Sequence, residues 1–511
     1  SVGSGRCNGV YPLSLVLSSH GTTLARLVTL IVFSERPAPV PLRVGTVLRL
    51  PASLTPAKVT QVARALHAAP ATAVDLLIEP LLLVRLSSTK EGTDALGQLR
   101  AAVGPPTRHV VLRSPFVPVD PGTLSVSGLS AELDQQLRRG DQIQHAAGLT
   151  TQTPLWVATS ATTPSTTSAL SALGATQMII DDASLAEPTA SSLTWGQPFS
   201  LTPGTSAILA MSADPQLSAE AQQSDGVLGA ARAIGDLAFL HFERPGLTIP
   251  QGVVMRLDAT RLSGAGLSAL LGGLAEQPVD GPVTLSELFA QVPQGANGAP
   301  VTRRLAQSAA SAPWPATQVT QIHTEEQRQT AFSSATGPKA AIGRTLSDQL
   351  LAAQSDVLGT NARTRSLRAT AAALDAQLRS VTISGAIITI TALKTSVPIT
   401  LTSSAGYPIT GVLRLSSSHL KFPKGATSTE VLDKPTKSLR IEVEAVTTGD
   451  LPMAATLSTP QGDLVIAHQR IVVRATHTSI VAIILTVGAA AVLFGWWLRD
   501  WWRRPRRRAR R

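Results

Sequence analysis

The order of apolar and polar positions changes several times along this chain, and one pattern runs from Val44 to about Val292. Short uninterrupted apolar runs alternate there with stretches whose apolar residues recur every three or four positions. Such runs are typical of parallel strands covered on both faces, and the stretches between them of amphipathic helices. About seven strand–helix units predict a (β/α) barrel of the deacetylase or glycosidase type, with a doubly wound sheet as the alternative. The expected strands lie in residues 44–51, 74–83, 108–116, 153–160, 176–184, 206–212 and 252–258.

Four other regions flank this barrel-like domain, which we assign to residues 44–298. Residues 382–475 alternate apolar with polar positions in about seven short segments, the pattern of an immunoglobulin-like β-sandwich. Residues 299–381 are polar and rich in alanine, and their spacing predicts helices packed on the barrel. Residues 1–34 predict two strands left from an N-terminal β-sandwich, and the Pro-rich residues 35–43 predict a linker.

The C-terminal end carries a different signal, an uncharged apolar run from Ser479 to Leu498. As a helix it spans roughly 30 Å, the thickness of the hydrocarbon core of a bilayer. Tryptophans at its end match an interfacial aromatic belt, and the arginines after them match a cytoplasmic flank. We therefore expect a single-pass plasma-membrane protein with a transmembrane helix at 479–498, its bulk outside and a basic cytoplasmic tail at 499–511. The interfacial residues are Trp496, Trp497, Trp501 and Trp502, and the tail arginines are Arg499, Arg503, Arg504, Arg506, Arg507, Arg508, Arg510 and Arg511.

Charge changes this picture little once it is located. The net charge is +11, and the tail from Arg499 contributes eight arginines and one aspartate to it. The remainder is spread over the preceding chain, whereas a nucleic-acid-binding protein concentrates its basic residues in a patch. We therefore expect no nucleic-acid partner, and we expect the tail to meet anionic lipid headgroups.

The single cysteine and the first residues bear on export. Cys7 alone cannot form an intrachain disulfide or a cysteine-based zinc site. The chain opens at Ser1 without the charged and apolar segments of a signal peptide, although an external domain before a single span requires export. We expect the export signal to lie in a segment that precedes this sequence.

Candidate catalytic residues are acids at the expected strand ends, where barrel enzymes carry their reactive groups. Two carboxylates across such a mouth can hydrolyse a glycosidic bond, one as the acid and the other as the nucleophile or base. Glu79 with either Asp181 or Asp182 is the preferred pair, and the alternative is that strand-end acids cap helices or solvate the rim. The residues at these ends are Glu79, His109, Asp120, Asp181, Asp182, Asp214 and Asp258, of which Glu79, Asp120, Asp181 and Asp182 are kept as candidate catalytic residues.

Other chemistries find less support. The nine histidines include no pair at a helical i, i+4 spacing, and the chain has no HExxH, GxSxG, Walker A or GxGxxG motif in the required context. Neither a metal nor a cofactor is expected. Aromatic residues make up 4% of the chain, and Trp156 and Trp195 are the tryptophans outside the C-terminal run that we considered as a sugar-stacking platform.

Taken in order, several segments resemble a family of exported, single-pass membrane proteins of unknown function from mycobacteria and other actinobacteria. They are GVYPLSLVL, DLLIEP, SPFVPVDPGTL, LGATQMIIDDASL, LAFLHFERPG, GPVTLSELF, GYPITGVLRLSSS and SLRIEVEA. The family's gene typically lies near that of the lipid II flippase, which implies a role in cell-wall synthesis. Its barrel is similar to those of polysaccharide deacetylases and related glycosidases.

The chain departs from that family at two acidic segments. The family usually has Asp-Pro at the second strand end, where this chain has Glu79-Pro80, and PYxDxD after the third, where PFVPVD leaves only Asp120. We therefore expect a membrane-anchored, non-catalytic scaffold or binding module of cell-envelope and peptidoglycan biogenesis, and not an enzyme.

Two alternatives stay open. One is a carbohydrate-active enzyme, a glycosidase or deacetylase acting on a wall polymer. The other is a regulator of a transporter or flippase that packs through Gly488 and Gly495 of the span. The partners expected are membrane lipid and either a wall-synthesis membrane protein, by resemblance the lipid II flippase, or wall glycan.

Overall fold

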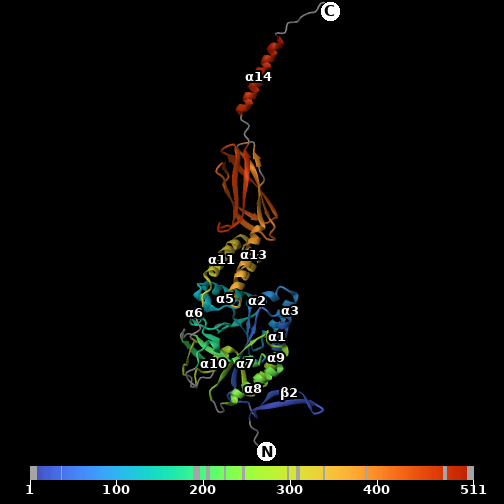
Figure 1. Cartoon of the computed structure of the whole chain (residues 1–511), viewed down its shortest axis with the longest axis vertical. Helices are drawn as coiled ribbons and strands as arrows, with labels where there is room; N and C mark the ends of the chain where they lie inside the picture. Colours follow the sequence, from blue (N-terminus) through green and yellow to red (C-terminus); the bar gives the residue numbers. More distant parts are fainter. Residues whose placement is uncertain are drawn as a thin grey trace, which may run out of the picture. The chain divides into compact units, whose positions relative to one another are not determined.

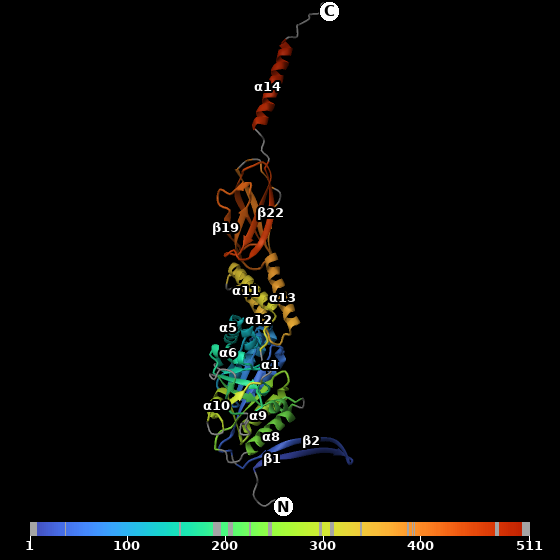
Figure 2. The same ribbon diagram turned by 60° about the vertical axis from the view of Figure 1, so that its left-hand side comes forward.

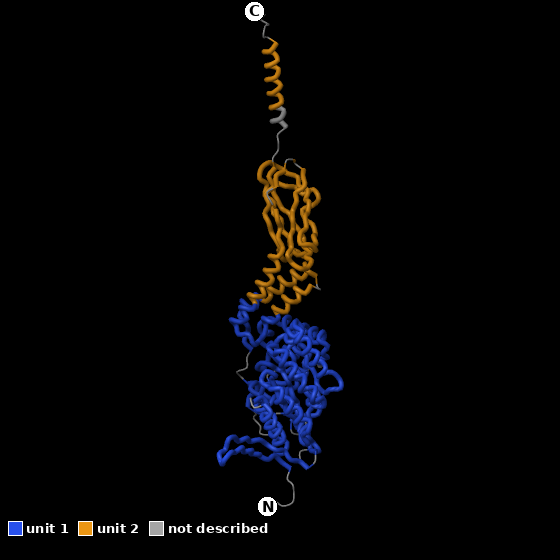
Figure 3. The backbone as a smooth tube through the Cα atoms, turned by 90° about the vertical axis from the view of Figure 1, so that its right-hand side faces the viewer, with its two compact units in different colours: residues 1–321, 351–366 blue, residues 322–350, 367–511 orange. Residues whose placement is uncertain are grey.

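The structure, a computed structural model, divides the chain into two compact units (Figure 3). Unit 1 contains residues 1–321 and 351–366, and unit 2 contains residues 322–350 and 367–511. The described residues are 8–35, 37–152, 155–187, 196–202, 208–223, 226–243, 248–295, 299–306, 311–337, 340–385, 388–390, 392, 394–475 and 480–502.

The first sheet of unit 1 is built around β3 (Leu42–Leu50), whose residues are nearly all buried. It pairs in parallel with β11 (Gly252–Asp258) on one side and with β4 (Val74–Ile78) on the other. Because side chains on both faces of these strands are covered, their sequences are runs of apolar residues. Beyond β4 follow β5 (His109–Leu112) and β6 (Thr151–Gln152), and β12 (Asp280–Val283) also pairs with β3.

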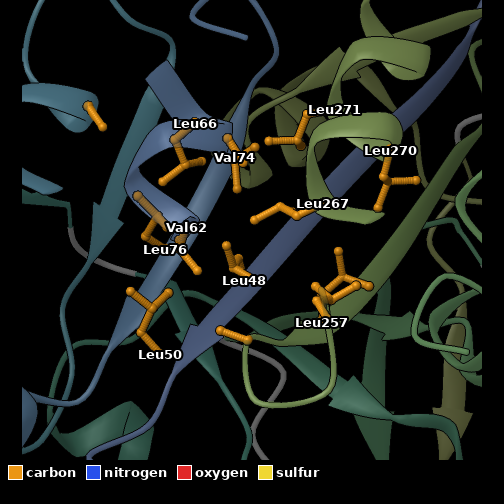
Figure 4. Close-up of a cluster of buried hydrophobic side chains, with 14 of the residues drawn as sticks. Leu48, Leu50, Val62, Leu66, Val74, Leu76, Leu257, Leu267, Leu270 and Leu271 are labelled. Carbon is orange, nitrogen blue, oxygen red and sulfur yellow. The ribbon is translucent and has the colours of Figure 1, made fainter. Parts of the chain in front are cut away.

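Helices cover this sheet and form its main core. Leucines such as Leu48 and Leu76 of the strands pack with Leu66 and Leu267 of the helices (Figure 4). Each of these side chains is almost entirely removed from water, and burying one leucine stabilises the fold by about 1.5–3 kcal/mol. The helices in this core are α1 (Pro56–Ala68), α2 (Pro80–Leu86), α3 (Lys90–Val103), α8 (Val227–Glu243) and α9 (Gly264–Glu276).

The second sheet of unit 1 has five strands. It contains β7 (Leu155–Val157), β8 (Gln177–Asp181) and β10 (Leu209–Ala213) in parallel, with β9 (Phe199–Thr202) and β13 (Thr302–Arg304) beyond them. β7 follows β6 in the chain after a two-residue gap, and the N–H of Asp214, after β10, donates to the carbonyl of Val254 in β11 at 2.8 Å. Strands of the two sheets are thus linked at both ends, and the mixed α/β multidomain fold is confirmed.

Local signals in the sequence explain where the helices between strands begin. Thr55, Thr89 and Ser263 each accept a hydrogen bond from the backbone of the first turn that follows. Thr163 and Thr284 form complete capping boxes, and such caps are worth about 0.5–2 kcal/mol each. The remaining helices of this region are α4 (Pro121–Val126), α5 (Ser130–Ala146), α6 (Pro164–Ala172), α7 (Pro215–Glu220) and α10 (Leu285–Gln291), with the 3-10 turn η1 (Asp182–Ser184).

Residues 9–33 form a hairpin of β1 (Gly9–Ser19) and β2 (Thr22–Phe33), turning at His20 and Gly21 with positive φ (Figure 2). The hairpin lies against α8, where Leu30 occupies the space that a side chain at Gly235 would need. Its origin as part of a larger sandwich stays a prediction.

Unit 2 contains two antiparallel-rich sheets that share one core (Figure 1). Alternate residues of their strands, such as Leu401, Leu413 and Leu457, point into this core. The immunoglobulin-like topology stays a prediction. One sheet has β14 (Val381–Ser384), β16 (Lys394–Ser403), β20 (Thr436–Ala445) and β18 (Leu420–Lys421); the other has β15 (Ile388–Ile390), β22 (Val465–Ala475), β21 (Gly449–Ser458), β17 (Ile409–Ser416) and β19 (Thr427–Leu432).

Three helices precede these sheets in the chain: α11 (Ala316–Thr336), α12 (Ala341–Ala352) and α13 (Thr360–Arg379). In unit 2, Phe332, Leu346 and Leu374 from the three helices form a small buried cluster. Arg328 of α11 pairs with Glu325 at 3.0 Å and also with Asp375 of α13.

The last helix, α14 (Ile480–Trp502), corrects the sequence-based expectation of a membrane protein. Among the described residues, no helix combines the length and the hydropathy needed to cross a bilayer. This finding corrects the expected span at 479–498, of which Ser479 lies outside the described residues, and with it the single-pass plasma-membrane location. The expected tail arginines from Arg503 onward lie outside the described residues.

Candidate active site

The register of the first sheet brings three charged residues together where its strands end. Arg49 in β3 lies opposite Asp258 in β11 and opposite Leu77 in β4. Glu79 is two residues beyond Leu77, and side chains two positions apart leave a strand on the same face. Arg49, Glu79 and Asp258 therefore share one face at the carboxyl ends of parallel strands.

A single guanidinium holds both acids. Arg49 donates from Nη2 to Glu79 Oε1 at 2.6 Å and from Nη1 to Asp258 Oδ2 at 3.4 Å. The second oxygen of Glu79 accepts from the Ala52 N–H at 2.8 Å, and Asp258 Oδ1 accepts from the N–H of Thr260 at 2.8 Å. The Glu79 side chain is only 11% exposed. Both carboxylates are thus fixed by a charged partner and by backbone, as a preorganised site requires.

Glu79 differs from other acids in an equivalent sequence position. Glu79, Asp120 and Asp214 each precede a proline that begins a helix. Asp120 and Asp214 use their carboxylates to cap their own helices, at 3.0 Å from the Gly122 N–H and 2.9 Å from the Gln216 N–H. Glu79 makes no capping hydrogen bond to α2. Its carboxylate is directed instead toward Arg49, so the capping alternative does not account for it.

Arg49, Glu79 and Asp258 line a cavity of about 380 Å³, within the range of about 300–1,000 Å³ usual for small-ligand sites. Its other walls are mostly apolar, and the end of α12 and the loop between α12 and α13 contribute some of its lining residues. Arg49 and Glu79 also line a smaller hollow, together with Arg113, Trp156 and Thr159. The cavity's remaining lining residues are Pro51, Ala52, Ser53, Leu81, Val117, Pro118, Thr260, Ala352, Ser355, Val357 and Leu358.

The same loop brings a fourth charged group, Asp356, to this region. Its N–H donates to the Pro118 carbonyl at 2.9 Å, and its Oδ2 lies 3.5 Å from the Thr159 hydroxyl. Burial raises the pKa of the Asp356 carboxyl above its usual value, Arg49 opposes this, and the negative charges of Asp120 and Glu79 add to it. A carboxyl group of raised pKa beside a fixed carboxylate is the combination used in acid–base catalysis.

The acids predicted from the sequence are not all brought together. Asp181 pairs with Arg256 of β11, whereas Asp182 lies 3.8 Å from Arg303 and 3.5 Å from the Ser212 hydroxyl. Burial raises the pKa of Asp182, and Arg303 partly offsets this. Neither aspartate shares a partner with Glu79, so the predicted pairing is replaced by Glu79 with Asp258.

Asp120 has a structural role close to the site. Besides capping α4, it accepts from the hydroxyls of Thr123 at 2.6 Å and Thr166 at 3.3 Å, which joins α4 to α6. Trp156 lies half-buried in the wall of the smaller hollow, and Trp195 lies outside the described residues. Trp496, Trp497, Trp501 and Trp502 are exposed on α14. In the part of the chain that is described, no three His, Cys, Asp or Glu residues lie together as metal ligands.

Comparison with known proteins gives similar structures but no family. No family model matches the chain, and no curated protein matches its sequence. A 4-alpha-glucanotransferase from Thermococcus litoralis aligns with 82% of this chain and 82% of its own, at 11% identity and a TM-score of 0.46. An alpha-amylase from Thermotoga maritima aligns with 66% of this chain and 94% of its own (12% identity, TM-score 0.44). A GH57-type branching enzyme from Pyrococcus horikoshii aligns with 66% and 89% (12%, 0.44).

The geometry of the site corrects the expectation of a non-catalytic scaffold. The reason given for a scaffold was the loss of acids from the expected positions, yet Asp258 and Asp356 supply carboxyl groups beside Glu79 from elsewhere in the chain. The interpretation as a non-catalytic scaffold is wrong, and so is the scaffold role in cell-envelope biogenesis that rested on it.

Proposed function

We propose that this chain is a carbohydrate-active enzyme that cleaves a glycosidic bond in the cavity beside Arg49, Glu79 and Asp258. The observation that carries the proposal is the Glu79 carboxylate, which leaves its own helix uncapped and is held at the cavity wall by Arg49 and the Ala52 N–H. Glycoside hydrolysis needs two carboxyl groups and no cofactor. This site contains more than one carboxyl group.

Arg49 fixes Glu79 and Asp258 at the cavity wall. Glu79 and Asp258 contact the two terminal nitrogens of one guanidinium at 2.6 and 3.4 Å. A planar guanidinium therefore keeps the bonded oxygens within about 8 Å of each other. In this site Glu79 attacks the anomeric carbon, and Asp258 fixes the Arg49 fork that orients it.

We also propose that the two sheets of unit 1 form a (β/α) barrel of the glycosidase type. The parallel strands β3, β4, β5, β6–β7, β8, β10 and β11 follow one another in space, which supports a (β/α) barrel of the glycosidase type. Reactive groups of such barrels lie at the carboxyl ends of the strands, as Glu79 and Asp258 do here. The two sheets of unit 2 are proposed as its immunoglobulin-like companion.

The substrate class is tested directly by the release of reducing ends. Purified protein is incubated with amylose, glycogen and purified peptidoglycan, since one similar structure is a 4-alpha-glucanotransferase and another an alpha-amylase, and the family resemblance implied a wall polymer. We expect cleavage of at least one glycan, and we expect Glu79→Gln to lower kcat by at least about 10⁴-fold, because the covalent intermediate cannot form without the carboxylate nucleophile.

A matched control separates catalysis from folding. Asp214→Asn changes an acid in the same acid–proline arrangement, but Asp214 is occupied with capping α7, and asparagine caps a helix as well as aspartate. This variant should retain full activity. Absence of cleavage by the unaltered protein on every glycan, or full activity of Glu79→Gln, would contradict the proposed function.

A further inference from the structure

We propose that Asp356, carried by the loop between α12 and α13, is the proton donor to the leaving-group oxygen in this reaction. The inference rests on the proposed function and assigns a catalytic role to a residue that lies on none of the strands of unit 1. Val357 and Leu358 beside it line the cavity together with Glu79.

The loop is held in place by contacts that converge on Asp356. Its backbone N–H donates to Pro118 at 2.9 Å, in the segment that forms another wall of the cavity. Two residues before it, the Gln354 Oε1 accepts from the buried Gln136 at 2.9 Å. These bonds tie the loop to α5 and to the segment after β5, both in unit 1.

Arg363 of α13 fixes the loop from its other side. Its Nη2 donates to the Ser355 carbonyl at 3.1 Å and to the Leu358 carbonyl at 2.8 Å, so it joins the two ends of the turn around Asp356. The guanidinium carbon lies 3.9 Å from the ring centroid of Trp314, where stacking restrains it further. Arg363 is itself buried, 5% exposed.

The Asp356 carboxyl group has the surroundings of a proton donor. Its Oδ1 is buried and accepts no hydrogen bond from the described residues, while Oδ2 has the Thr159 hydroxyl at 3.5 Å. The charged groups that act on it are Arg49, Glu79 and Asp120 from the strand ends and Arg363 from α13. Burial and the two neighbouring carboxylates favour the protonated form more than the arginines oppose it, and the pKa of Asp356 is raised.

The chemical step balances with these two residues and one water molecule. As the bond between the anomeric carbon and the glycosidic oxygen breaks, its electron pair stays on that oxygen, which takes the proton of Asp356 and leaves as an alcohol. An oxygen of Glu79 forms the new bond to the anomeric carbon. Water then displaces Glu79, gives one proton back to Asp356 and leaves its hydroxyl on the sugar.

The leaving group of the substrate provides the test. Asp356→Asn is assayed on the glycan cleaved by the unaltered protein and on the 2,4-dinitrophenyl glycoside of the same sugar, whose leaving group needs no proton. We expect kcat/KM to fall about 10²–10⁴-fold on the glycan and to stay within about tenfold on the activated glycoside, because kcat/KM reports the bond-breaking step and not the later step in which Asp356 takes a proton from water. The alkaline limb of the pH–rate profile should disappear in Asp356→Asn and persist in Asp356→Glu.

Each outcome decides one question. Equal losses on both substrates, or no loss on either, would overturn the role of Asp356 while Glu79→Gln still tests the proposed function. Glycan cleavage by no form of the protein overturns the proposed function itself. Asp94→Asn, on the exposed surface of α3, is the control for an aspartate change that should alter neither substrate's turnover.

Discussion

Arg49 is the residue on which the candidate site depends, because it is the shared partner of two carboxylates that come from different strands. The Arg49 side chain is 29% exposed, Glu79 11% and Asp258 24%. In partly buried clusters of this kind, removing one partner costs more than the net value of the contact, because the remaining charges are left without compensation.

Arg49→Met should therefore destabilise the protein by about 1–3 kcal/mol, measured as a lower urea midpoint. Arg49→Lys keeps the positive charge but cannot bind both carboxylates as a planar guanidinium does. Its urea midpoint should therefore lie between those of the unaltered protein and Arg49→Met. The control is Arg108→Met, which breaks the exposed pair with Glu287 at 2.8 Å and should cost less than about 1 kcal/mol. An equal effect of the two methionine changes would show that Arg49 does not hold the site together.

Asp280 poses the opposite situation, a buried acid without compensation. It is 7% exposed, neither of its carboxylate oxygens has a hydrogen-bond partner among the described residues, and burial raises its pKa to about 7. Asp75, which accepts from the Leu285 N–H at 2.8 Å, also has a pKa of about 7 because of its burial. Both acids favour the folded state in their protonated form.

Stability should consequently fall as the pH rises from about 4 to about 7. The folded-state pKa of Asp280 lies above its ordinary value of 3.8, so its contribution is complete below that value and is lost as the folded group ionises. Asp280→Asn cannot ionise, and its urea midpoint should vary less with pH than that of the unaltered protein. It should be the more stable form at pH 8, and a parallel pH dependence of the two proteins would contradict this assignment.

At the scale of elements, the loop between α12 and α13 is the part most sensitive to a single side chain. Arg363 supplies hydrogen bonds to both Ser355 and Leu358, and no regular secondary structure holds residues 355–359. Local opening of such a segment is governed by few contacts.

Arg363→Met should increase amide hydrogen exchange in residues 355–359 by at least about tenfold, equivalent to about 1.4 kcal/mol of opening free energy. Exchange in the β3–β4 region should not change. Arg365→Met, an exposed residue of the same helix, serves as control and should leave the loop's exchange unchanged. Faster exchange throughout unit 1 would indicate general destabilisation instead of a local role.

Elements also show how far sequence patterns reach. The parallel strands were predictable because each is an apolar run bounded by a helix signal. In VDLLIEPLLL the strand was predicted too long, since residues 80–86 form α2 with Leu82, Leu83 and Leu86 buried at helical spacing. An all-apolar run carries no periodicity that separates the two structures. Only the proline at the first helical position marked the change.

The same limit applies to the site. Glu79 could be predicted because acids at strand ends meet in a parallel sheet, and Asp258 stood at such an end as well. Asp356 follows the last strand of the barrel-like region by a long stretch of chain, and no local pattern indicates that its loop returns to Pro118. The ion pairs of Asp181 with Arg256 and of Asp182 with Arg303 could not be predicted either, because the arginines come from distant parts of the sequence.

For the whole molecule, two patterns gave different results. The described chain contains a mixed α/β unit and a unit with two sheets of alternating strands, while the domain bounds expected from the sequence stay predictions. The apolar C-terminal run does not yield a membrane-crossing helix within the described chain. The resemblance to actinobacterial envelope proteins, and a wall-synthesis protein or wall glycan as partner, stay predictions.

Unit 1 is interrupted in the chain, because residues 351–366 return to it after residues 322–350 have entered unit 2. A gene encoding such a protein has no single cut point that separates the two units. Recombination with a crossover anywhere between codons 322 and 356 would combine the Arg49, Glu79 and Asp258 of one parent with the Asp356 of another. Codons 49 to 356 must therefore be inherited as one block, and substitutions within that block are selected together.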